Sequence, residues 1–278
     1  MHASPSQSTS PDTAPAEREP WFSIRQPIAF GRSISLGIAI WVIFFGSWEL
    51  VVLFELVSPL LLPAPHEVLV ALYEQIVHKG FLSDIGISIL RIVFSFLIAC
   101  AIAVPLGILM GTFTAVEAFA NPFVSAWRYL PAPAFIPILL MWFGTGEAPK
   151  IALLTIGVVF FLITLIMDHT RGVRRELIET ALTLGGNNSQ VLWTVVVPAV
   201  MPKVMAAMRQ MLAVSWTYLV IAEIVASTTG IGAMMMRARR FLHTDEIMAG
   251  ILVIGILGLL FDIMFRKAHG ALFPYDKS

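Results

Sequence analysis

The sequence predicts an all-α protein that crosses a membrane about six times. Of its 278 residues, 58% are hydrophobic and only 13% are charged, and the mean hydropathy is +0.84. Soluble domains carry about 45–50% apolar and about 25% charged residues, so this chain has too little charge to cover a water-facing surface. It is also too hydrophobic to be disordered. Its apolar runs are long and unbroken rather than alternating, which argues against β-barrel strands.

Several classes of function are disfavoured by the composition. The 18 Lys and Arg balance the 18 Asp and Glu, whereas a nucleic-acid partner usually requires a basic face. The single cysteine, Cys100, excludes an internal disulfide and any metal site with several cysteine ligands. No Gly is followed by Lys, so the chain has no Walker A loop for ATP. No Gly-x-Ser-x-Gly or His-Glu-x-x-His pattern supports a membrane enzyme. We therefore expect a non-enzymatic chain without a metal or cofactor of its own.

The chain divides into three regions by composition. The first 20 residues are rich in Ser, Pro, Ala and Thr, which is typical of disorder. The first apolar run begins only after Ser33 and is too long for a signal peptide. We therefore expect a disordered tail and cytoplasmic lead-in over residues 1–32, a membrane domain over 33–268, and a cytoplasmic tail over 269–278.

Six runs are apolar enough for a helix of about 20 residues to cross a bilayer. The third run contains four prolines and must be bent or interrupted. With the N-terminus inside, the inner segments hold ten Lys and Arg and the outer segments hold five. This bias predicts a multi-pass protein of the cell membrane with both termini in the cytoplasm. The six runs cover roughly residues 34–57, 84–110, 119–143, 151–167, 195–222 and 247–265.

The inner segment after the fourth run has the pattern of a helix–turn–helix. Leu177, Ala181 and Leu184 share one helical face, and Gly185 with Gly186 would end that helix. The next three residues, Asn187, Asn188 and Ser189, are candidates to cap a second short helix that reaches Trp193. An amphipathic interfacial linker is the simpler interpretation.

A resemblance favours the more specific interpretation. The segment reads Glu179-Thr180-Ala181, three residues, Gly185, nine residues, then Val195-Val196-Val197-Pro198. It resembles the EAA loop of ABC importer permeases, which reads Glu-Ala-Ala, three residues, Gly, nine residues, Ile-x-Leu-Pro. Every spacing agrees, and the exchanges at Thr180, Val195 and Val197 are small or apolar.

Further stretches narrow the resemblance to permeases for nitrate, alkanesulfonate, taurine and bicarbonate. The similarity covers roughly residues 60–270. The stretches that carry it are residues 128–137, 142–144, 222–224, 230–232 and 238–245.

This resemblance implies a type I ABC importer fold and a set of partners. The expected assembly has two permease chains, as a homodimer, two ABC ATPase chains that bind the ATP, and an extracytoplasmic binding protein that delivers a small oxyanion. The loop would sit in a groove on the ATPase. A type I permease for another solute, or an ATP-independent channel or secondary transporter, is the alternative. The residues expected to couple the loop to the ATPase are Arg174, Arg175, Glu179, Ala181, Leu184 and Gly185.

Ionisable residues inside membrane spans are costly and are functional candidates. Arg91 and Arg128 either line a path for an anion or pair with a carboxylate such as Asp84 or Glu223. Trp216 and its hydroxyl-bearing neighbours form either a pathway wall or a packing surface between helices. The candidate translocation path therefore comprises Arg91, Arg128, Ser215, Trp216, Thr217 and Glu223.

Three arginines are exceptions to the excess of positive charge on the inner side. Arg237, Arg239 and Arg240 fall in a segment assigned to the outer side. We expect a short outward-facing helix that docks acidic patches of the binding protein. Contact with lipid headgroups is the alternative.

Overall fold

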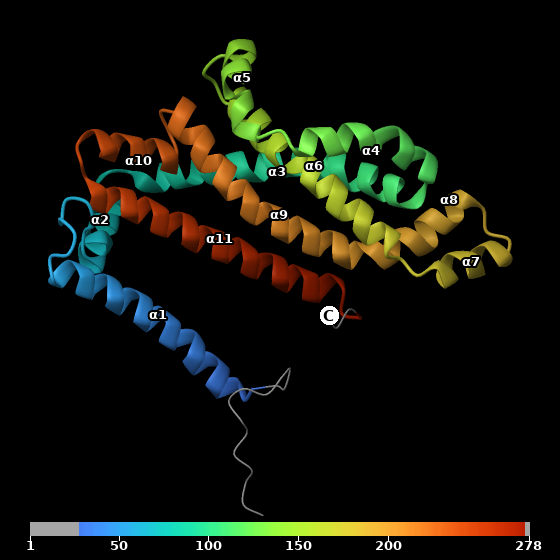
Figure 1. Cartoon of the computed structure of the whole chain (residues 1–278), viewed down its shortest axis with the longest axis horizontal. Coiled ribbons are helices and arrows are strands. Elements are labelled where there is room, and N and C mark those ends of the chain that lie inside the picture. The colour runs from blue at the N-terminus through green and yellow to red at the C-terminus, as the bar shows by residue number, and fades with distance from the viewer. Residues whose placement is uncertain (1–27, 276–278) are drawn as a thin grey trace, which may run out of the picture. The chain divides into compact units, whose positions relative to one another are not determined.

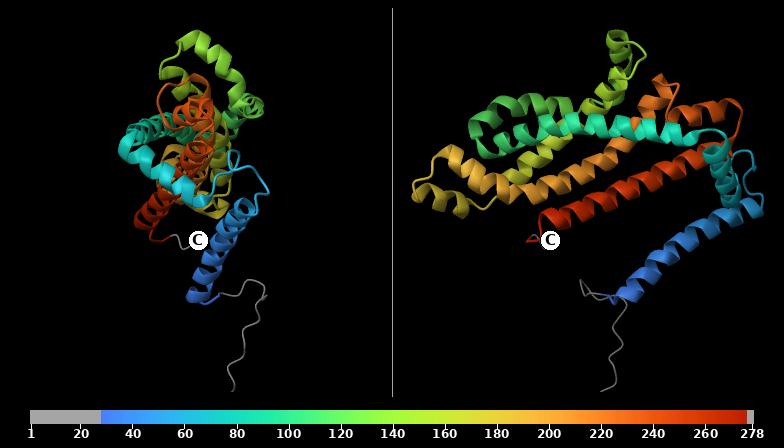
Figure 2. Two further views of the ribbon diagram at one scale, coloured as in Figure 1. Left: turned by 90° about the vertical axis from the view of Figure 1, so that its left-hand side faces the viewer. Right: turned by 180° about the vertical axis from the view of Figure 1, so that it is seen from behind.

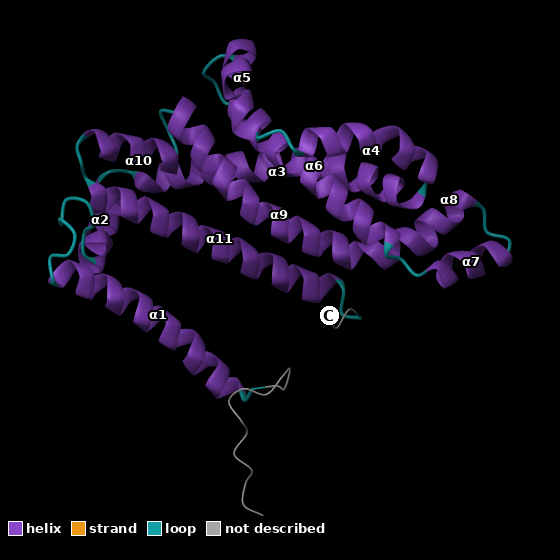
Figure 3. Cartoon of the chain, in the orientation of Figure 1, coloured by secondary structure: helices purple, strands orange, loops and turns teal. Residues whose placement is uncertain are grey.

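A computed structural model describes residues 28–275, and every regular element in that range is a helix (Figures 1 and 3). The predicted all-α class is therefore confirmed. Most of the predicted tail, residues 1–27, lies outside the described residues, as do residues 276–278. The helices are α1 (Phe30–Leu53), α2 (Pro65–His78), α3 (Phe81–Thr112), α4 (Thr114–Arg128), α5 (Ile136–Phe143), α6 (Ala148–Arg171), α7 (Arg175–Thr183), α8 (Asn188–Val191), α9 (Val197–Ala226), α10 (Ile231–Arg240) and α11 (Thr244–Leu272), with a 3₁₀-helix at Ala132–Phe135 and a π-helix at Leu192–Val196.

The described residues form two compact units that meet between residues 48 and 49 of the sequence. The described part of the first unit is most of α1, whose aromatic side chains stack on one another, as Trp41 does on Phe45. Its 24 residues give a helix of about 36 Å, which is long enough to cross the hydrocarbon core. The first span was predicted to continue to Val57, which is wrong. The helix ends at Leu53, and the backbone of Glu55 is left-handed with a φ of 52°.

The core of the second unit lies where the long helices α3, α6 and α9 contact one another. Completely buried side chains line these contacts, among them Ile92, Leu162 and Leu219. The helices α9 and α11 run alongside each other in Figure 1 and in the rear view of Figure 2. The helices α3, α6 and α9 carry polar residues of the candidate functional site and position them relative to one another.

Two glycines of α3 allow α3 and α6 to approach closely. A Cβ atom at Gly107 would lie 2.8 Å from the Cβ of Ile166, and one at Gly111 would lie 2.4 Å from the Cβ of Thr170. The two glycines are four residues apart, which is the spacing of a GxxxG helix-packing motif. The GxxxG spacing is present in the sequence, but hydropathy alone does not reveal it.

The predicted interruption of the third span is confirmed. The segments Thr114–Arg128 and Ala132–Phe143 are bent by 85° relative to each other. Trp127 stacks on Phe135 across the break and on Phe160 of α6, with ring centroids 5.5 and 5.6 Å apart. Within the described residues, five helices are long and apolar enough to cross a membrane, or six if the bent pair is one span.

Two short helices complete the second unit. The amphipathic helix α2 was not predicted, because its 14 residues are too few for a span. The short helix expected around the three arginines is α10. Both pack on α11 around a small core that contains Phe81, Ile231 and Met234. This cluster positions the turn before α10.

Candidate functional site

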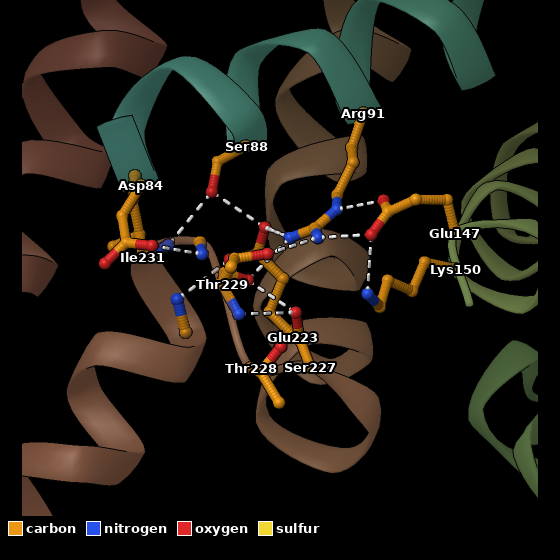
Figure 4. A network of polar contacts seen from close by, with 12 residues as sticks. Asp84, Ser88, Arg91, Glu147, Lys150, Glu223, Ser227, Thr228, Thr229 and Ile231 are labelled. Atoms are coloured by element: carbon orange, nitrogen blue, oxygen red, sulfur yellow. Dashed lines mark hydrogen bonds and ion pairs between the residues drawn. The ribbon is translucent and has the colours of Figure 1, made fainter. Parts of the chain in front are cut away.

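A buried arginine joins three separate parts of the second unit (Figure 4). Arg91 projects from α3, and its side chain is only 2% exposed. Its Nη1 donates to Glu223 Oε1 at 2.7 Å and to the carbonyl oxygen of Thr229 at 2.8 Å. Its Nε and Nη2 donate to the two carboxylate oxygens of Glu147 at 2.5 and 2.6 Å, and Nη2 also donates to Thr229 Oγ1 at 3.0 Å. All five donors of the guanidinium therefore have acceptors.

Glu223 of α9 is the buried anion of this network. Its side chain is completely buried and also accepts hydrogen bonds from Ser88 Oγ at 2.7 Å and from the Gly232 amide at 2.8 Å. Ser88 and Arg91 lie on the same face of α3, three residues apart. Removing one member of a buried ion pair leaves an uncompensated charge and costs about 3–5 kcal/mol. The Arg91–Glu223 pair therefore fastens α9 to α3.

The turn between α9 and α10 wraps tightly around this pair. Gly230 has a φ of 105°, and a Cβ atom there would lie 2.3 Å from Glu223 Oε1 and 2.6 Å from Arg91 Nη1. Its amide donates to Asp84 Oδ1 at 2.7 Å, and Asp84 Oδ2 accepts from Arg237 Nη2 at 2.6 Å. Only glycine satisfies both the backbone conformation and the lack of space.

Glu147 is the exposed member of the network. It precedes α6, its side chain is 54% exposed, and it also accepts from Lys150 Nζ at 2.8 Å. The Lys150 side chain is itself only 4% exposed. Hydrogen bonds from Arg91, and then from Lys150, lower the pKa of Glu147 to about 2.

This depressed pKa predicts a pH dependence of stability. A carboxylate with a lowered pKa stabilises the folded state fully above its unfolded pKa, and that contribution is lost as the pH falls through the folded pKa. We therefore expect wild type to be more stable than Glu147→Gln by a constant margin between pH 6 and 8. The margin should shrink from about pH 5 towards pH 2. Thermal unfolding of both proteins across this range measures it, and a margin independent of pH would contradict the assignment.

The structure selects among the alternatives for the predicted path residues. Arg91 pairs with Glu223, which was one of its two predicted carboxylate partners. The other, Asp84, pairs with Arg237 instead. Arg128 is half-buried, lies 5.3 Å from the ring centroid of Tyr129 and forms no ion pair within the described residues. No hydrogen bond or ion pair between described residues joins it to Arg91.

The three path residues of α9 differ in their surroundings. Ser215 is buried and donates to the carbonyl oxygen of Met211 at 3.1 Å. Trp216 is buried beside Phe261, and no described residue accepts a hydrogen bond from its indole nitrogen. Thr217 is exposed. The burial of Ser215 and Trp216 favours a role in packing between helices. Among the described residues, neither side chain forms a hydrogen bond with Arg91.

Sequence reasoning missed Glu147, Lys150 and Thr229. The available signal was the pair Glu147 and Lys150, which stand three residues apart at the start of an apolar helix. Oppositely charged residues at this spacing can interact. Only the fold shows that Arg91, 56 residues earlier, reaches the same carboxylate.

The predicted helix–turn–helix is present as α7 and α8. Gly185 has a φ of 87°. Its amide donates to the carbonyl of Leu182 at 2.9 Å, and the Gly186 amide donates to the carbonyl of Ala181 at 3.0 Å. These two bonds form a Schellman motif, which confirms that glycine ends the helix. Since α7 ends at Thr183, Leu184 is its C-cap residue and not part of a continuous helical face with Leu177.

Asn187 is the cap of the second helix. Its Oδ1 accepts from the Gln190 amide, and Gln190 Oε1 accepts from the Asn187 amide, both at 2.9 Å. This reciprocal pair is a capping box. A π-helix follows, closed by the Val197 amide donating to the carbonyl of Leu192, and its wider turn precedes Pro198, which has no amide hydrogen to donate.

Several apolar side chains on and beside α7 and α8 are exposed. Ile178 and Ala181 pack against the core, whereas Leu184 is 83% exposed and Leu177 is 44% exposed. Trp193, just beyond α8, is 66% exposed.

The charged residues of α7 pair with each other. Arg175 Nε lies 2.7 Å from Glu179 Oε1, and Arg174 Nε lies 3.5 Å from Glu176 Oε2. The pKa of Glu176 is lowered, first by a hydrogen bond from its own backbone amide and then by Arg174. Exposed pairs of this kind contribute little to stability, so both arginines are free to exchange partners at an interface.

The arginines of α10 have two different environments. Arg237 is tied to Asp84 and donates to the carbonyl of Thr228 at 2.8 Å. Arg239 and Arg240 are exposed, and neither forms an ion pair within the described part of the chain. Arg237 is also exposed, so Arg239 and Arg240 differ from it in having no ion pair among the described residues.

The chain is similar in sequence to known membrane transport proteins. Residues 103–274 match the family model described as "Binding-protein-dependent transport system inner membrane component". The chain is 32% identical over 249 residues to the taurine transport system permease protein TauC of Escherichia coli (strain K12), covering 88% of this chain and 90% of TauC. It is 29% identical to SsuC of Bacillus subtilis (strain 168), a permease assigned to aliphatic sulfonates transport, covering 87% and 88% of the two chains.

The fold has a counterpart among solved structures. A chain of the MetNI methionine ABC transporter, in an inward-facing conformation, superimposes with a TM-score of 0.59 at 18% identity. The match covers 66% of this chain and 92% of the MetNI chain.

Proposed function

This chain belongs to the family of binding-protein-dependent transport system inner membrane components, and from this premise we propose that it is the conduit through which an ATP-driven importer passes a small oxyanion. As an ABC importer permease it is a multi-pass inner-membrane protein. In the proposed assembly, separate ATPase chains bind and hydrolyse ATP, and this chain performs no chemistry of its own.

The observation that carries the proposal is the exposure of three apolar side chains on and beside α7 and α8. Leu177, Leu184 and Trp193 stand outside the core on a segment whose turn is fixed by Gly185. A helix–turn–helix with exposed apolar side chains is suited to a groove on a partner. We propose that this partner is the ATPase and that Arg174, Arg175 and Glu179 adjust to charges around the groove. Closure of two ATPases would then move α7 and α8 together with the spans that flank them.

Relatives named for taurine and aliphatic sulfonates support a proposal for the substrate class. A sulfonate group is a compact anion, and arginine is the residue best suited to contact it by two hydrogen bonds. We propose a small sulfonate as the substrate, with nitrate and bicarbonate as the neighbouring possibilities. A different small solute carried by the same type of permease is the alternative.

The remaining partners are proposed from the positions of the charged residues. The exposed Arg239 and Arg240, with Arg237, would meet acidic patches of an extracytoplasmic binding protein. A second copy of the chain would complete the conduit, with Arg128 facing the cavity between the copies. Both termini would lie in the cytoplasm, in keeping with the distribution of Lys and Arg.

Ligand-dependent ATPase activity tests the proposed function. The chain should be purified with its ATPase and binding protein and assayed with taurine, an alkanesulfonate, nitrate and bicarbonate. One of these should stimulate ATP hydrolysis at least several-fold, and only when the binding protein is present. Unchanged hydrolysis with all four would contradict the proposed substrate class, and failure of the ATPase to co-purify would contradict the assignment of partners.

A further inference from the structure

We propose that the Glu147 side chain occupies, from within the chain, a binding site for a small oxyanion formed by Arg91 and Lys150. The proposal rests on the proposed function, because it takes the transported oxyanion as the ligand that displaces Glu147. It goes beyond that function by assigning a defined site within the permease and a carboxylate that competes for it.

The hydrogen bonds around Glu147 have the geometry of oxyanion recognition. Arg91 offers Nε and Nη2 side by side, one to each carboxylate oxygen, at 2.5 and 2.6 Å. Lys150 Nζ adds a third donor at 2.8 Å. A guanidinium binds a planar oxyanion by such a pair of parallel bonds. Sulfonate, nitrate and bicarbonate each carry at least two oxygens on one central atom, so each can replace the carboxylate at these donors.

The rest of the network holds the guanidinium in place. Nη1 is committed to Glu223 and to the Thr229 carbonyl, and neither bond involves Glu147. Glu223 is completely buried and has two further donors, Ser88 and Gly232. The Nε and Nη2 edge of Arg91 therefore keeps its direction when Glu147 leaves, which is the preorganisation that favours ligand binding.

The charges require an anion at this position. Arg91 and Lys150 are both cationic, with side chains only 2% and 4% exposed. Without Glu147, Glu223 is the only carboxylate bonded to Arg91 within the described residues. Since a buried charge without a partner is unfavourable, an anion from solution should enter when Glu147 is withdrawn. Exchange of one anion for another leaves the net charge of the site unchanged.

Glu147 is also the network member best placed to leave. Its side chain is 54% exposed, and it follows the loop Gly144-Thr145-Gly146. Gly144 has a φ of 71°, and a Cβ atom would meet nothing within 4 Å at either glycine. Figure 4 shows Glu147 approaching Arg91 from the side opposite Ser88 and Asp84. Rotation about this open loop would withdraw the carboxylate without disturbing the buried side of the network.

Removal of the internal carboxylate tests the proposal. The full chain in lipid nanodiscs carries Glu147→Gln, and its melting temperature is measured in chloride, nitrate, bicarbonate and taurine at equal ionic strength. We expect the variant to melt below wild type in chloride. At least one oxyanion should restore the melting temperature, with a half-maximal concentration at least tenfold lower than that for any shift of wild type. Glu74→Gln, which removes an exposed carboxylate of α2, should change neither property.

A second substitution tests the role of the lysine. In the Glu147→Gln background, Lys150→Met should raise the oxyanion concentration needed for the rescue at least tenfold. Rescue by chloride as effective as that by every oxyanion would overturn the proposal, as would no rescue at all or a rescue indifferent to Lys150. These measurements need no ATPase, so their failure leaves the proposed import function standing.

A measurement on wild type covers the case in which the variant does not fold. Hydrogen exchange of the amides at residues 144–147 should be faster in saturating oxyanion than in chloride, because the loop is released from Arg91. Exchange that is unchanged or slower in all three oxyanions would refute displacement of Glu147.

Discussion

Gly185→Val is expected to reduce ATP-driven uptake severely while the protein remains inserted in the membrane. Gly185 has a φ of 87°, where a β-branched residue is a steric outlier. The left-handed conformation costs an L-residue about 1–2 kcal/mol, and relief of that cost would break the two hydrogen bonds that end α7. Because a Cβ atom at this glycine meets nothing within 4 Å, the effect comes from the backbone alone. We expect uptake to fall at least tenfold in cells that contain normal amounts of the permease.

A matched substitution separates the backbone effect from loss of glycine itself. Asparagine tolerates the left-handed conformation better than other non-glycine residues, so Gly185→Asn should retain most of the uptake. The same strains should be compared for co-purification of the ATPase. Normal uptake by the valine variant would show that the shape of this turn does not matter for coupling.

Gly230→Ala is expected to destabilise the folded protein strongly. The added Cβ would lie 2.3 Å from Glu223 Oε1, at a φ of 105°. Relief of the clash requires Glu223 or Arg91 to move, which disrupts a buried ion pair whose loss costs about 3–5 kcal/mol. We expect the free energy of unfolding to fall by about 3 kcal/mol or more, measured by equilibrium unfolding in mixed micelles.

The helix α3 offers the control for this substitution. Gly86 has no atom within 4 Å of an added Cβ and lies inside a helix, where alanine is favoured over glycine by about 0.5–1 kcal/mol. Gly86→Ala should therefore be neutral or stabilising. Equal losses for both variants would mean that the network around Arg91 does not hold the turn before α10.

Local sequence patterns were sufficient for the elements whose structure depends on neighbouring residues. The break in the third span followed from its prolines, and the end of α7 followed from Gly185, because backbone restrictions act at those residues themselves. The cap at Asn187 was one of three candidates, and the capping box with Gln190 decides among them. Apolar length alone located the long helices, although it placed the end of α1 four residues too late.

The polar network could not be derived in the same way. Arg91 was a candidate because charge inside a span is unusual, and Glu223 was named among its possible partners. Glu147 and Thr229, however, lie 56 and 138 residues away from Arg91, and no local periodicity links them. Gly230 appeared only within a stretch of resemblance, since its requirement for glycine comes from side chains of two other helices.

As the proposed conduit of an ATP-driven oxyanion importer, this chain should transport labelled taurine into proteoliposomes that also contain its ATPase and the binding protein. We expect this uptake to require ATP inside the vesicles and to stop when the ATPase is replaced by a variant unable to hydrolyse ATP. Uptake at the same rate without ATP or without the ATPase would show that the chain is not the conduit of such an importer and would instead indicate a channel or secondary transporter.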